Sequence, residues 1–591
     1  MKQSILLITA ILCGAILMMG QGGGGAGKGK GGGGAAAAKG KAVPEEGIPV
    51  TSDLVIAKCG TCHTKDEKGN LSRISYSRAT PEGWEEAIKR MVRLNGLSLQ
   101  PAEARTILKY LGTNHGLAPE EAKPLMYMAE HRIQDEVIPN ESIRTTCMQC
   151  HALGRAFQWH RTKEDWTLLT NMHVAFFPQA DAAFRRGANG NGGGGGEAAP
   201  AAAPGAAPVS LDTSLDFLAT KYGLHTPEWS AWKARMRTPK IAGKWMVLAH
   251  IPGKGQYAGE MTVTQGAAED EFTTSTTLKP LMGSGPAITR TGTGLVYAGY
   301  SWRGRSKATT AVATPRPGEL SSEMREAMWL SPDQTSGEGR WFWGEYQEFG
   351  LDVTLKRVTG APTLFTMDKP SLMRGTTAQQ VKLMGSSLPA TVTAADLDFG
   401  PGVTVKSIVS KSATEVVASV DIAPTAVFGK RDVALGLAVL PSAYAVYDKV
   451  DYIKVTPDTA LSRLGSDVHP KGYQQFEAVG VNRGEDGKLH TADDVEIGPI
   501  EVTWAMEEFY AVFGDDDRDF VGSLNDSGLF TPNTDGPNPA RKFSRNNYGD
   551  VWAVATATKE KDKEGKPLTG KSYLVVTVPT YIRWDQPEVG Q

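Results

Sequence analysis

Two short cysteine motifs constrain this chain more than any other feature of its sequence. They are Cys59-Gly-Thr-Cys62-His63 and Cys147-Met-Gln-Cys150-His151. A cysteine pair separated by two residues and followed at once by histidine is typical of c-type haem attachment. The four cysteines would form thioethers to the porphyrins, and each histidine would become an axial ligand of the iron. The sequence therefore predicts two covalently bound haem c groups and a role in electron transfer.

The alternative interpretation is a zinc site, because two Cys-x-x-Cys pairs can form a cage of four thiolates. Three observations oppose it: a histidine follows both pairs, the pairs lie far apart, and the chain begins like an exported protein. The cysteine count also favours haem. Four of the five cysteines lie in the motifs and the fifth, Cys13, lies in the leader. No thiol is left to interfere with haem attachment in an oxidising compartment.

Residues 1–20 are predicted to be a signal peptide. Lys2 supplies the positive start, and residues 5–19 form an apolar run that is too short to span a bilayer. Residues 21–47, mostly Gly, Ala and Lys, are expected to form a flexible tether, because they have few side chains to bury. A similar Gly/Ala/Pro insert at residues 187–208 is expected to be disordered. The mature chain is therefore expected in the periplasm.

The length predicts a multidomain protein, and the net charge predicts no broad basic surface that could bind nucleic acid. The chain has 591 residues and a formal net charge of −2. We expect an all-α dihaem cytochrome c domain at residues 48–239, followed by three all-β domains. The first, residues 240–361, has the alternating runs of an antiparallel β-barrel-like domain. Residues 362–457 and 458–591 have the size and turn spacing of immunoglobulin-like β-sandwiches.

Individual strands are predicted from the alternation of apolar and polar residues. In the barrel-like segment they include residues 244–250, 295–302 and 351–358, and in the last segment residues 509–513. The acidic residues Asp515, Asp516, Asp517 and Asp519 are interpreted as a solvated turn. They lack the glycine and the distal glutamate of the helical calcium-binding motif.

Each haem motif is followed by a helix that begins near a tryptophan. Met91 lies seven residues after Trp84, and His173 lies seven residues after Trp166. Seven residues make two helical turns, so each side chain shares a helix face with its tryptophan. Methionine and histidine are common sixth ligands of haem iron. We therefore predict that Met91 and His173 complete the coordination of the two irons.

The first iron is thus expected between His63 and Met91, and the second between His151 and His173. A His/Met iron should have the higher reduction potential, because a thioether ligand favours ferrous iron. The two haems would then form a directed relay.

Other side chains could take these positions. Met91 could be ordinary core filler. Other candidates for the first iron are His115 and His131, which are interpreted as surface or loop histidines. For the second iron the alternatives are His160 and Met172.

Beyond the haem motifs, several stretches resemble the α subunit of quinohaemoprotein amine dehydrogenases, and the resemblance covers nearly all of the chain after the tether. In the haem region these stretches are Leu71-Ser-Arg-Ile-Ser75, Thr80-Pro-Glu-Gly-Trp84, Lys109-Tyr-Leu111, Gly116-Leu-Ala-Pro-Glu-Glu121, Asn171-Met-His-Val174 and Phe177-Pro178. In the β region they are Gly339-Arg-Trp-Phe342, Asp352-Val353, Asp535-Gly-Pro-Asn-Pro539 and Gly549-Asp-Val-Trp552. The family often has a histidine a few residues after the methionine that Met91 matches, and this chain has Asn95 near that place.

The resemblance implies a periplasmic enzyme of three subunits. A small subunit would carry cysteine tryptophylquinone, which oxidises primary amines, and a β-propeller subunit would help to enclose it. This chain would pass electrons from the quinone through its haems to a soluble acceptor, either a cytochrome c or a blue-copper protein. The amine-oxidising site would lie on another chain, and no catalytic residue is expected here.

Two other functions are compatible with the haem motifs. The chain could be a free-standing dihaem carrier whose β-domains bind another protein or the cell surface, without a quinone-bearing partner. It could also be a dihaem peroxidase, which would need a five-coordinate iron and a distal acid/base residue. Co-purification of a quinone-bearing chain would argue against the free-standing carrier. Peroxide consumption would identify the peroxidase.

Overall fold

The structure is a computed structural model of the 591-residue chain. It describes residues 45–126, 138, 140–148, 151–189, 210–283, 285–309, 320–344, 348–510 and 512–579. The predicted signal peptide, most of the predicted tether and insert, Cys150 and His131 lie outside these residues. Residues 187–189, which were expected to belong to the insert, end a helix instead. Within the described ranges, no helix is both long and apolar enough to cross a membrane.

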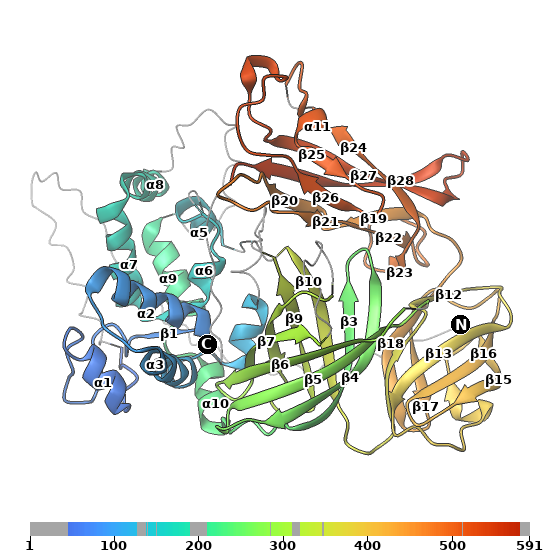
Figure 1. Ribbon diagram of the computed structural model, residues 1–591, viewed down its shortest axis with the longest axis horizontal. Coiled ribbons are helices and arrows are strands. Elements are labelled where there is room, and N and C mark those ends of the chain that lie inside the picture. The colour runs from blue at the N-terminus through green and yellow to red at the C-terminus, as the bar shows by residue number, and fades with distance from the viewer. Residues whose placement is uncertain are drawn as a thin grey trace, which may run out of the picture. The chain divides into compact units, whose positions relative to one another are not determined.

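The first part of the described chain is mainly helical (Figure 1). Its helices are α1 (Asp53–Cys59), α2 (Pro81–Asn95), α3 (Pro101–Asn114), α4 (Pro119–Ala122), η1 (Lys123–Leu125), α5 (Glu141–Thr146), α6 (Gly154–Phe157), α7 (Lys163–Phe176), α8 (Pro178–Asn189), α9 (Leu211–Lys221) and α10 (Pro227–Arg235). The region is not entirely helical, because β1 (Ser77–Ala79) and β2 (Trp159–Arg161) pair in a two-stranded antiparallel sheet. This sheet joins the half that contains the first motif to the half that contains the second.

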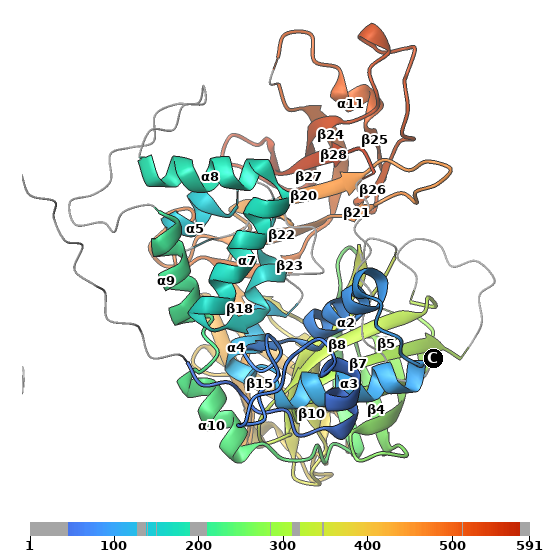
Figure 2. The same cartoon turned by 90° about the vertical axis from the view of Figure 1, so that its left-hand side faces the viewer.

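The helices that carry the predicted distal ligands begin in the same way. Thr80 caps α2 and Thr162 caps α7, and each hydroxyl accepts a hydrogen bond from the backbone N–H three residues later. Trp84 and Trp166 follow in the first turns and are buried. Figure 2 shows α7 leading into α8, and both helices pack against α9. The repeated start places each predicted ligand two turns along its helix.

The second part is a closed eight-stranded antiparallel barrel. Its strands are β3 (Gly243–Ile251), β4 (Gly255–Gln265), β5 (Glu271–Pro280), β6 (Ile288–Tyr297), β7 (Ser301–Ala308), β8 (Met324–Leu330), β9 (Ser336–Trp343) and β10 (Phe349–Arg357). β10 pairs with β3, with Asp352 opposite His250, and this pairing closes the barrel. Large apolar side chains such as Trp245, Phe272 and Trp341 fill the core. The interior is therefore packed.

One predicted strand of the barrel was wrong. Residues 295–302 form a hairpin, because β6 ends at Tyr297 and β7 begins at Ser301. Ala298 and Gly299 adopt left-handed backbone angles, with φ of 48° and 78°, and reverse the chain. A Cβ atom at Gly299 would lie 2.6 Å from the carbonyl oxygen of Arg237, so a larger residue does not fit there. Apolar residues continue through the turn, which made the run look like one strand.

The third part consists of two sheets that share one core. Its elements are β11 (Thr363–Met367), β12 (Ser371–Met373), β13 (Gln379–Ser386), η2 (Ala394–Asp396), β14 (Leu397–Asp398), β15 (Val403–Lys411), β16 (Glu415–Ile422), β17 (Gly429–Leu435) and β18 (Ala438–Tyr447). One sheet has the order β11-β13-β16-β15 and the other β12-β18-β17-β14. Val381, Phe399, Val416 and Tyr444 are buried in their common core.

The last part is also formed mainly of strands. Its elements are β19 (Tyr452–Thr456), β20 (Thr459–Arg463), β21 (Gln474–Gln475), β22 (Glu477–Asn482), β23 (Val495–Pro499), β24 (Val502–Glu508), α11 (Asp517–Phe520), β25 (Gly522–Leu524), β26 (Leu529–Pro532), η3 (Lys542–Ser544), β27 (Gly549–Lys561) and β28 (Pro567–Thr577). They form sheets ordered β19-β22-β23, β20-β28-β27-β24 and β21-β26-β25. A helical region followed by β regions was expected, and this order is confirmed.

Two predictions for the last part were wrong. The described residues 509, 510, 512 and 513 are not in a strand, and Phe513 is 98% exposed after β24. The acidic run that follows is not simply solvated, because Asp517 is buried and pairs with Arg541. Asp516 also pairs with Arg541, at 2.7 Å between Oδ1 and Nη2. Arginines from a distant loop therefore neutralise these carboxylates.

Candidate haem sites

The first motif lies at the end of a short helix. Ser52 caps the start of α1, and Cys59 is its last residue. The backbone N–H groups of Cys62 and His63 both donate to the Cys59 carbonyl oxygen, at 3.2 Å and 2.9 Å. Cys59 is half-buried against the core around α2 and α3, whereas Cys62 is exposed. Burial raises the pKa of the Cys59 thiol, with a smaller contribution from the neighbouring Cys62.

The ring of His63 is oriented by a contact with a backbone carbonyl. Its Nδ1 lies 2.7 Å from the Ser72 carbonyl oxygen, which can only accept, so Nδ1 donates and Nε2 is left for a metal. Such outer contacts orient metal-ligating histidines and raise their basicity. The next residue, Arg73, has a left-handed φ of 69°. A strained residue beside this carbonyl is the kind of outlier that marks functional sites.

The second motif follows α5. Cys147 is the C-cap of that helix and donates its backbone N–H to the Ile143 carbonyl oxygen at 2.9 Å. Its half-buried sulfur lies 3.3 Å from the Thr146 hydroxyl oxygen. Cys150 lies outside the described residues, so its position relative to Cys147 stays a prediction. The exposed His151 donates Nδ1–H to the Ala152 carbonyl oxygen at 2.7 Å, which again leaves Nε2 available.

The structure brings His151 and His173 together. Their ring centroids are 6.4 Å apart, and the ring planes make an angle of 34°. The His173 Nδ1 lies 2.8 Å from the Leu169 carbonyl oxygen and donates to it, so Nε2 of this ring is also free. Imidazole nitrogens bind first-row metal ions at roughly 2 Å, so rings on opposite sides of one iron have centroids roughly 6 Å apart. The observed separation fits one iron between the two rings.

Met91 lies on α2, as its spacing from Trp84 predicted. Its side chain is half-buried, and the neighbouring Ile88 packs against the same core as Cys59. An unbranched thioether on this helix is a suitable ligand for a haem attached at Cys59. Its role as the ligand of the first iron remains a prediction.

The fully buried His160 is poorly placed to bind the second iron. Its Nδ1 lies 3.1 Å from the Gly223 carbonyl oxygen and 3.3 Å from Arg78 Nη2. Arg78 in turn forms two hydrogen bonds with Glu121, at 2.8 Å and 3.0 Å. Burial lowers the pKa of His160 to about 4, although Glu121 opposes this shift. This network gives His160 a structural role. The other alternative, Met172, is exposed.

The interpretation of His115 as a surface or loop histidine was wrong. It caps the C-terminus of α3, and its side chain is completely buried beside the rings of Trp84 and Tyr110. Its carbonyl oxygen accepts a hydrogen bond from Trp84 Nε1 at 2.8 Å. Burial lowers the pKa of its ring to about 4. His115 therefore belongs to the packing around α2. His131 lies outside the described residues.

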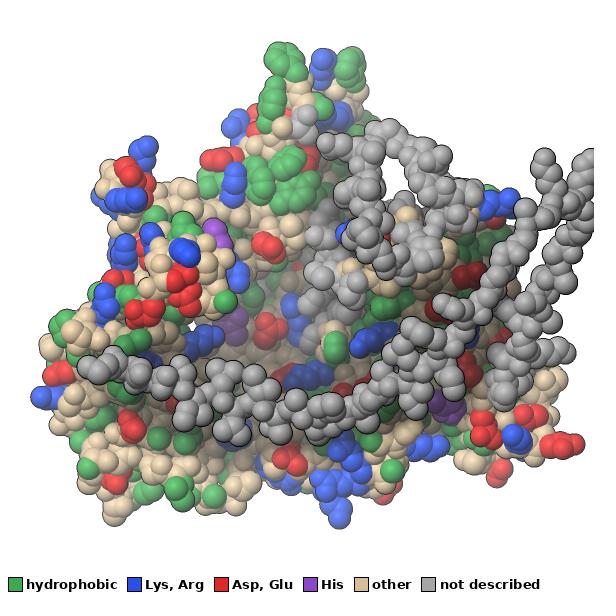
Figure 3. Space-filling model, turned by 180° about the vertical axis from the view of Figure 1, so that it is seen from behind, with side chains coloured by type: hydrophobic (Ala, Val, Ile, Leu, Met, Phe, Trp, Pro, Cys, Tyr) green, Lys and Arg blue, Asp and Glu red, His purple; other side chains and the backbone are tan. Residues whose placement is uncertain are grey.

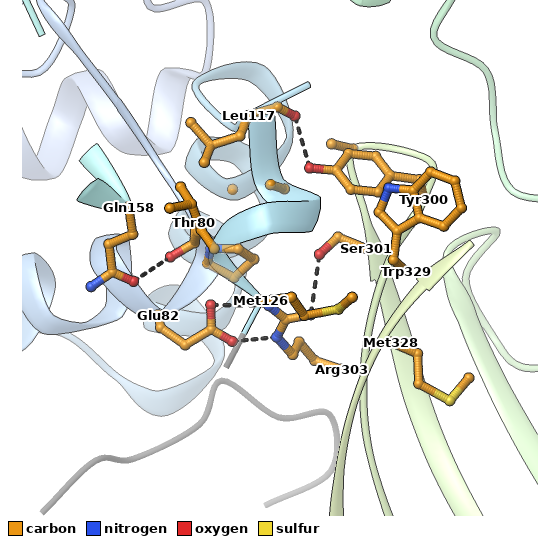
Figure 4. Close-up of a pocket in the computed structure, with 15 residues that line it drawn as sticks. Thr80, Glu82, Leu117, Met126, Gln158, Tyr300, Ser301, Arg303, Met328 and Trp329 are labelled. Atoms are coloured by element: carbon orange, nitrogen blue, oxygen red, sulfur yellow. Dashed lines mark hydrogen bonds and ion pairs between the residues drawn. The ribbon is translucent and has the colours of Figure 1, made fainter. Parts of the chain in front are cut away.

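A cavity lies between the helical region and the barrel, next to a buried ion pair (Figure 4). Arg303 of β7 binds both carboxylate oxygens of Glu82 at the start of α2, with Nη2 3.2 Å from Oε2. Tyr300 and Trp329 line the cavity on the barrel side, and the Tyr300 hydroxyl donates to the Leu117 carbonyl oxygen at 3.0 Å. Its volume of about 30 Å³ leaves room for water but not for an organic substrate.

Comparisons with solved structures and curated proteins give little further information. A redesigned beta barrel is 15% identical over 20% of this chain and 91% of its own length, with a TM-score of 0.16. A human protocadherin-24 EC1-2 structure is 12% identical over 38% of this chain and 99% of its own length, with a TM-score of 0.15. No curated protein matches the chain.

Four family models match consecutive parts of the chain. Residues 50–190 match the haem-binding model of quinohemoprotein amine dehydrogenase A, alpha subunit. Models of alpha subunit domains II, III and IV of quinohemoprotein amine dehydrogenase match residues 238–358, 361–448 and 453–589. These matches agree with the motifs and with the order of helical and β regions. The chain therefore belongs to the quinohaemoprotein amine dehydrogenase family, as a haem-binding alpha subunit.

Proposed function

We propose that this chain is the electron-transfer subunit of a periplasmic quinohaemoprotein amine dehydrogenase. Electrons from cysteine tryptophylquinone on a separate small subunit would pass through two covalent haem c groups to a soluble cytochrome c or blue-copper protein. Family membership supports a haem-bearing subunit that works with other subunits. The observation that carries the proposal is the proximity of the His151 and His173 rings, whose centroids are 6.4 Å apart, as expected for the second haem.

The chain's own residues would attach and orient the haems, which supply one-electron redox chemistry when bound. The proposed thioether residues are Cys59 and Cys62 for the first haem, and Cys147 and Cys150 for the second. The proposed axial ligands are His63 and Met91 for the first iron, and His151 and His173 for the second. In three of these four axial residues the ring Nδ1–H donates to a backbone carbonyl, which supports Nε2 as the ligand atom.

Exposed aromatic residues support a contact with other subunits, which we propose to be the β-propeller and the small quinone-bearing chain. Two of them lie between β24 and α11, and the third lies in η3. Exposed hydrophobic side chains gather in places on the surface in Figure 3. Tyr510, Phe513 and Phe543 are 67%, 98% and 91% exposed. Large exposed apolar side chains are enriched where proteins bind one another. These three side chains therefore support binding of another protein chain by the last region.

The immunoglobulin-like interpretation of the last two regions is also part of our proposal. Two four-stranded sheets around one core at residues 363–447 support it for the third region. The last region has one four-stranded and two three-stranded sheets, so it would be a more elaborate member of the same class.

The proposal can be tested on the complex isolated natively from the periplasm with its partners. Under argon, a simple primary amine should produce the absorption band of ferrous haem. A hydrazine, which blocks quinone carbonyls, should abolish this response and leave reduction by dithionite intact. If dithionite reduces both haems but amine reduces neither, the amine dehydrogenase assignment fails and the free-standing dihaem carrier replaces it. Spectral titration of the denatured chain should give two haems per chain.

A further inference from the structure

The two halves of the haem region meet at Trp159. This residue lies on β2, which pairs with β1 from the first half. Its ring packs against the apolar cores of both halves, one around α2 and α3 and the other around α5, α7 and α9. The Trp84 ring makes an edge contact with it at 5.2 Å between centroids. We call this junction the seam, defined by β1, β2, Trp84, Trp159 and Trp166.

Arg161 extends the seam from Trp159 to the second half. Its guanidinium carbon lies 4.2 Å from the Trp159 ring centroid and 5.6 Å from that of Trp166. Its Nη1 donates to the Ser77 hydroxyl at 3.0 Å. Its Nε is buried and has no hydrogen-bond partner among the described residues. A guanidinium has five N–H donors, so Arg161 can bind a further acceptor.

Arginine charge exceeds carboxylate charge at the seam. Burial lowers the pKa of Arg161 to about 9, Asp165 opposes the shift, and Arg73 and Arg90 add to it. Asp165 is already engaged by Arg73, with Nε 2.9 Å from Oδ1. Partly buried like charges are costly unless anions neutralise them. Since Arg73 already pairs with Asp165, the carboxylate whose charge acts on Arg161, the seam can accept a further anion.

A second arginine reaches the same region from α6. Burial lowers the pKa of Arg155, Glu86 opposes the shift, and Arg90 adds to it. The positive charge of Arg90 thus acts on both Arg155 and Arg161. Arg90 lies on α2 directly before Met91, and Arg155 lies four residues after His151. The sequence therefore places Arg90 beside the proposed ligand of the first iron and Arg155 one helical turn after a proposed ligand of the second.

We propose that Arg161 and Arg155 bind the propionate carboxylates of haem at the seam. The inference rests on the proposed function only in requiring two haem c groups. Propionates are the anionic side chains of haem, and the planar fork of arginine binds carboxylates with two parallel hydrogen bonds. Arg161 is held in place by Trp159, Trp166 and Ser77, so little side-chain entropy is lost on binding.

This arrangement predicts an effect on the haem potentials. Ferric haem carries one more positive charge than ferrous haem, so a nearby guanidinium favours the ferrous state. Arg161 and Arg155 should therefore raise the reduction potential of the haem whose propionates they bind. A purely structural role for Arg161 would not change the potential of a correctly attached haem.

The experiment compares R161Q and R155Q in the full chain, matched for the loss of one charge. The control is R93Q, because Arg93 is exposed on α2 and water screens its charge. The midpoint potential of each haem is measured by spectroelectrochemical titration, and haem content is measured separately. We expect a lower potential for at least one haem in R161Q and R155Q, little change in R93Q and partial recovery in R161K.

The inference is overturned if R161Q and R155Q bind two haems and keep the potentials of the unmodified chain. It is also overturned if R93Q lowers the potentials as much as they do, because the effect would then be unspecific. If R161Q does not retain haem, R155Q and R161K decide the question. A chain that binds fewer than two haems before any substitution contradicts the proposed function instead, so the two failures are distinguishable.

Discussion

The two halves of the haem region use the same motif but support it differently. His63 is half-buried and donates to the carbonyl oxygen of Ser72, nine residues away. His151 is exposed and donates to its neighbour Ala152. The first ring is therefore oriented by a carbonyl outside the motif, whereas the second is oriented by its neighbour and lies close to the His173 ring. The comparison teaches that the same Cys-x-x-Cys-His motif can occur in two settings, because the rest of the fold determines the surroundings of each histidine ring.

The helices that carry the two proposed distal ligands, α2 and α7, also differ in how far the rest of the fold covers them. The core around α2 includes Leu295 and Tyr297 of the barrel, and the Glu82–Arg303 ion pair lies beside it. On α7, Val174 and Phe176 are exposed, as is Phe177 directly after the helix. The first half is thus fixed to the barrel, and the second presents apolar surface close to its proposed iron. We expect the second haem to be the more accessible to other molecules.

Removing His173 should have the largest effect on this comparison. H173A should leave covalent haem attachment intact and convert the second iron from six-coordinate low-spin to five-coordinate high-spin. The visible and electron paramagnetic resonance spectra report this change directly. M172A is the matched control, because Met172 is exposed on the same helix and should leave the spectra unchanged. An unchanged low-spin spectrum in H173A would falsify the assignment of His173.

Replacing Met91 with histidine should make the two irons alike. M91H would turn a His/Met iron into a His/His iron, and its potential should fall by on the order of 0.2 V, within the roughly 0.8 V range set by axial ligands. Redox titration should then show the two potentials closer together. Loss of the thioether–iron absorption near the red end of the visible spectrum gives an independent readout. The assignment of Met91 fails if the M91A variant keeps both the thioether–iron absorption and the potential of the unmodified first haem.

Breaking the Glu82–Arg303 pair should destabilise the first half selectively. E82Q leaves a buried guanidinium beside a neutral amide, which should cost roughly 3 kcal/mol of stability. Urea denaturation followed by circular dichroism at the helical band would measure the loss. The control is D216N, because the Lys163–Asp216 pair of the second half is solvent-exposed and contributes far less. Equal losses of stability in E82Q and D216N would contradict the idea that a buried ion pair fixes the first half more firmly than the second.

The sequence correctly predicted that Met91 and His173 lie on helices two turns after Trp84 and Trp166, because helical spacing is a local pattern. It missed the seam, because the pairing of β1 with β2 connects residues 82 apart, as in Arg78 opposite His160. The burial of His115 also depends on distant packing.

The β regions show the same limit. The Arg541 partner of Asp517 lies 24 residues away, so the acidic run looked solvated in the sequence. The hairpin at Ala298 was missed because the apolar residues continue through the turn, so the sequence shows no break there. Local periodicity thus predicts elements, and it misses contacts that depend on how those elements are brought together.

The smallest predicted effect concerns the helix caps. T80A and T162A each remove a hydroxyl that accepts a backbone N–H, and each should cost about 1 kcal/mol. The Glu82–Arg303 pair also holds the start of α2, so α2 should stay helical when the Thr80 cap is lost. In contrast, α7 should unfold at its start when the Thr162 cap is lost, and His173 should then leave the iron at a lower temperature. Mild heating of T162A should therefore produce high-spin signal before T80A changes the first haem. T162S, which keeps the hydroxyl, should behave as the unmodified chain, and the reverse order would show that the first half is the less firmly held.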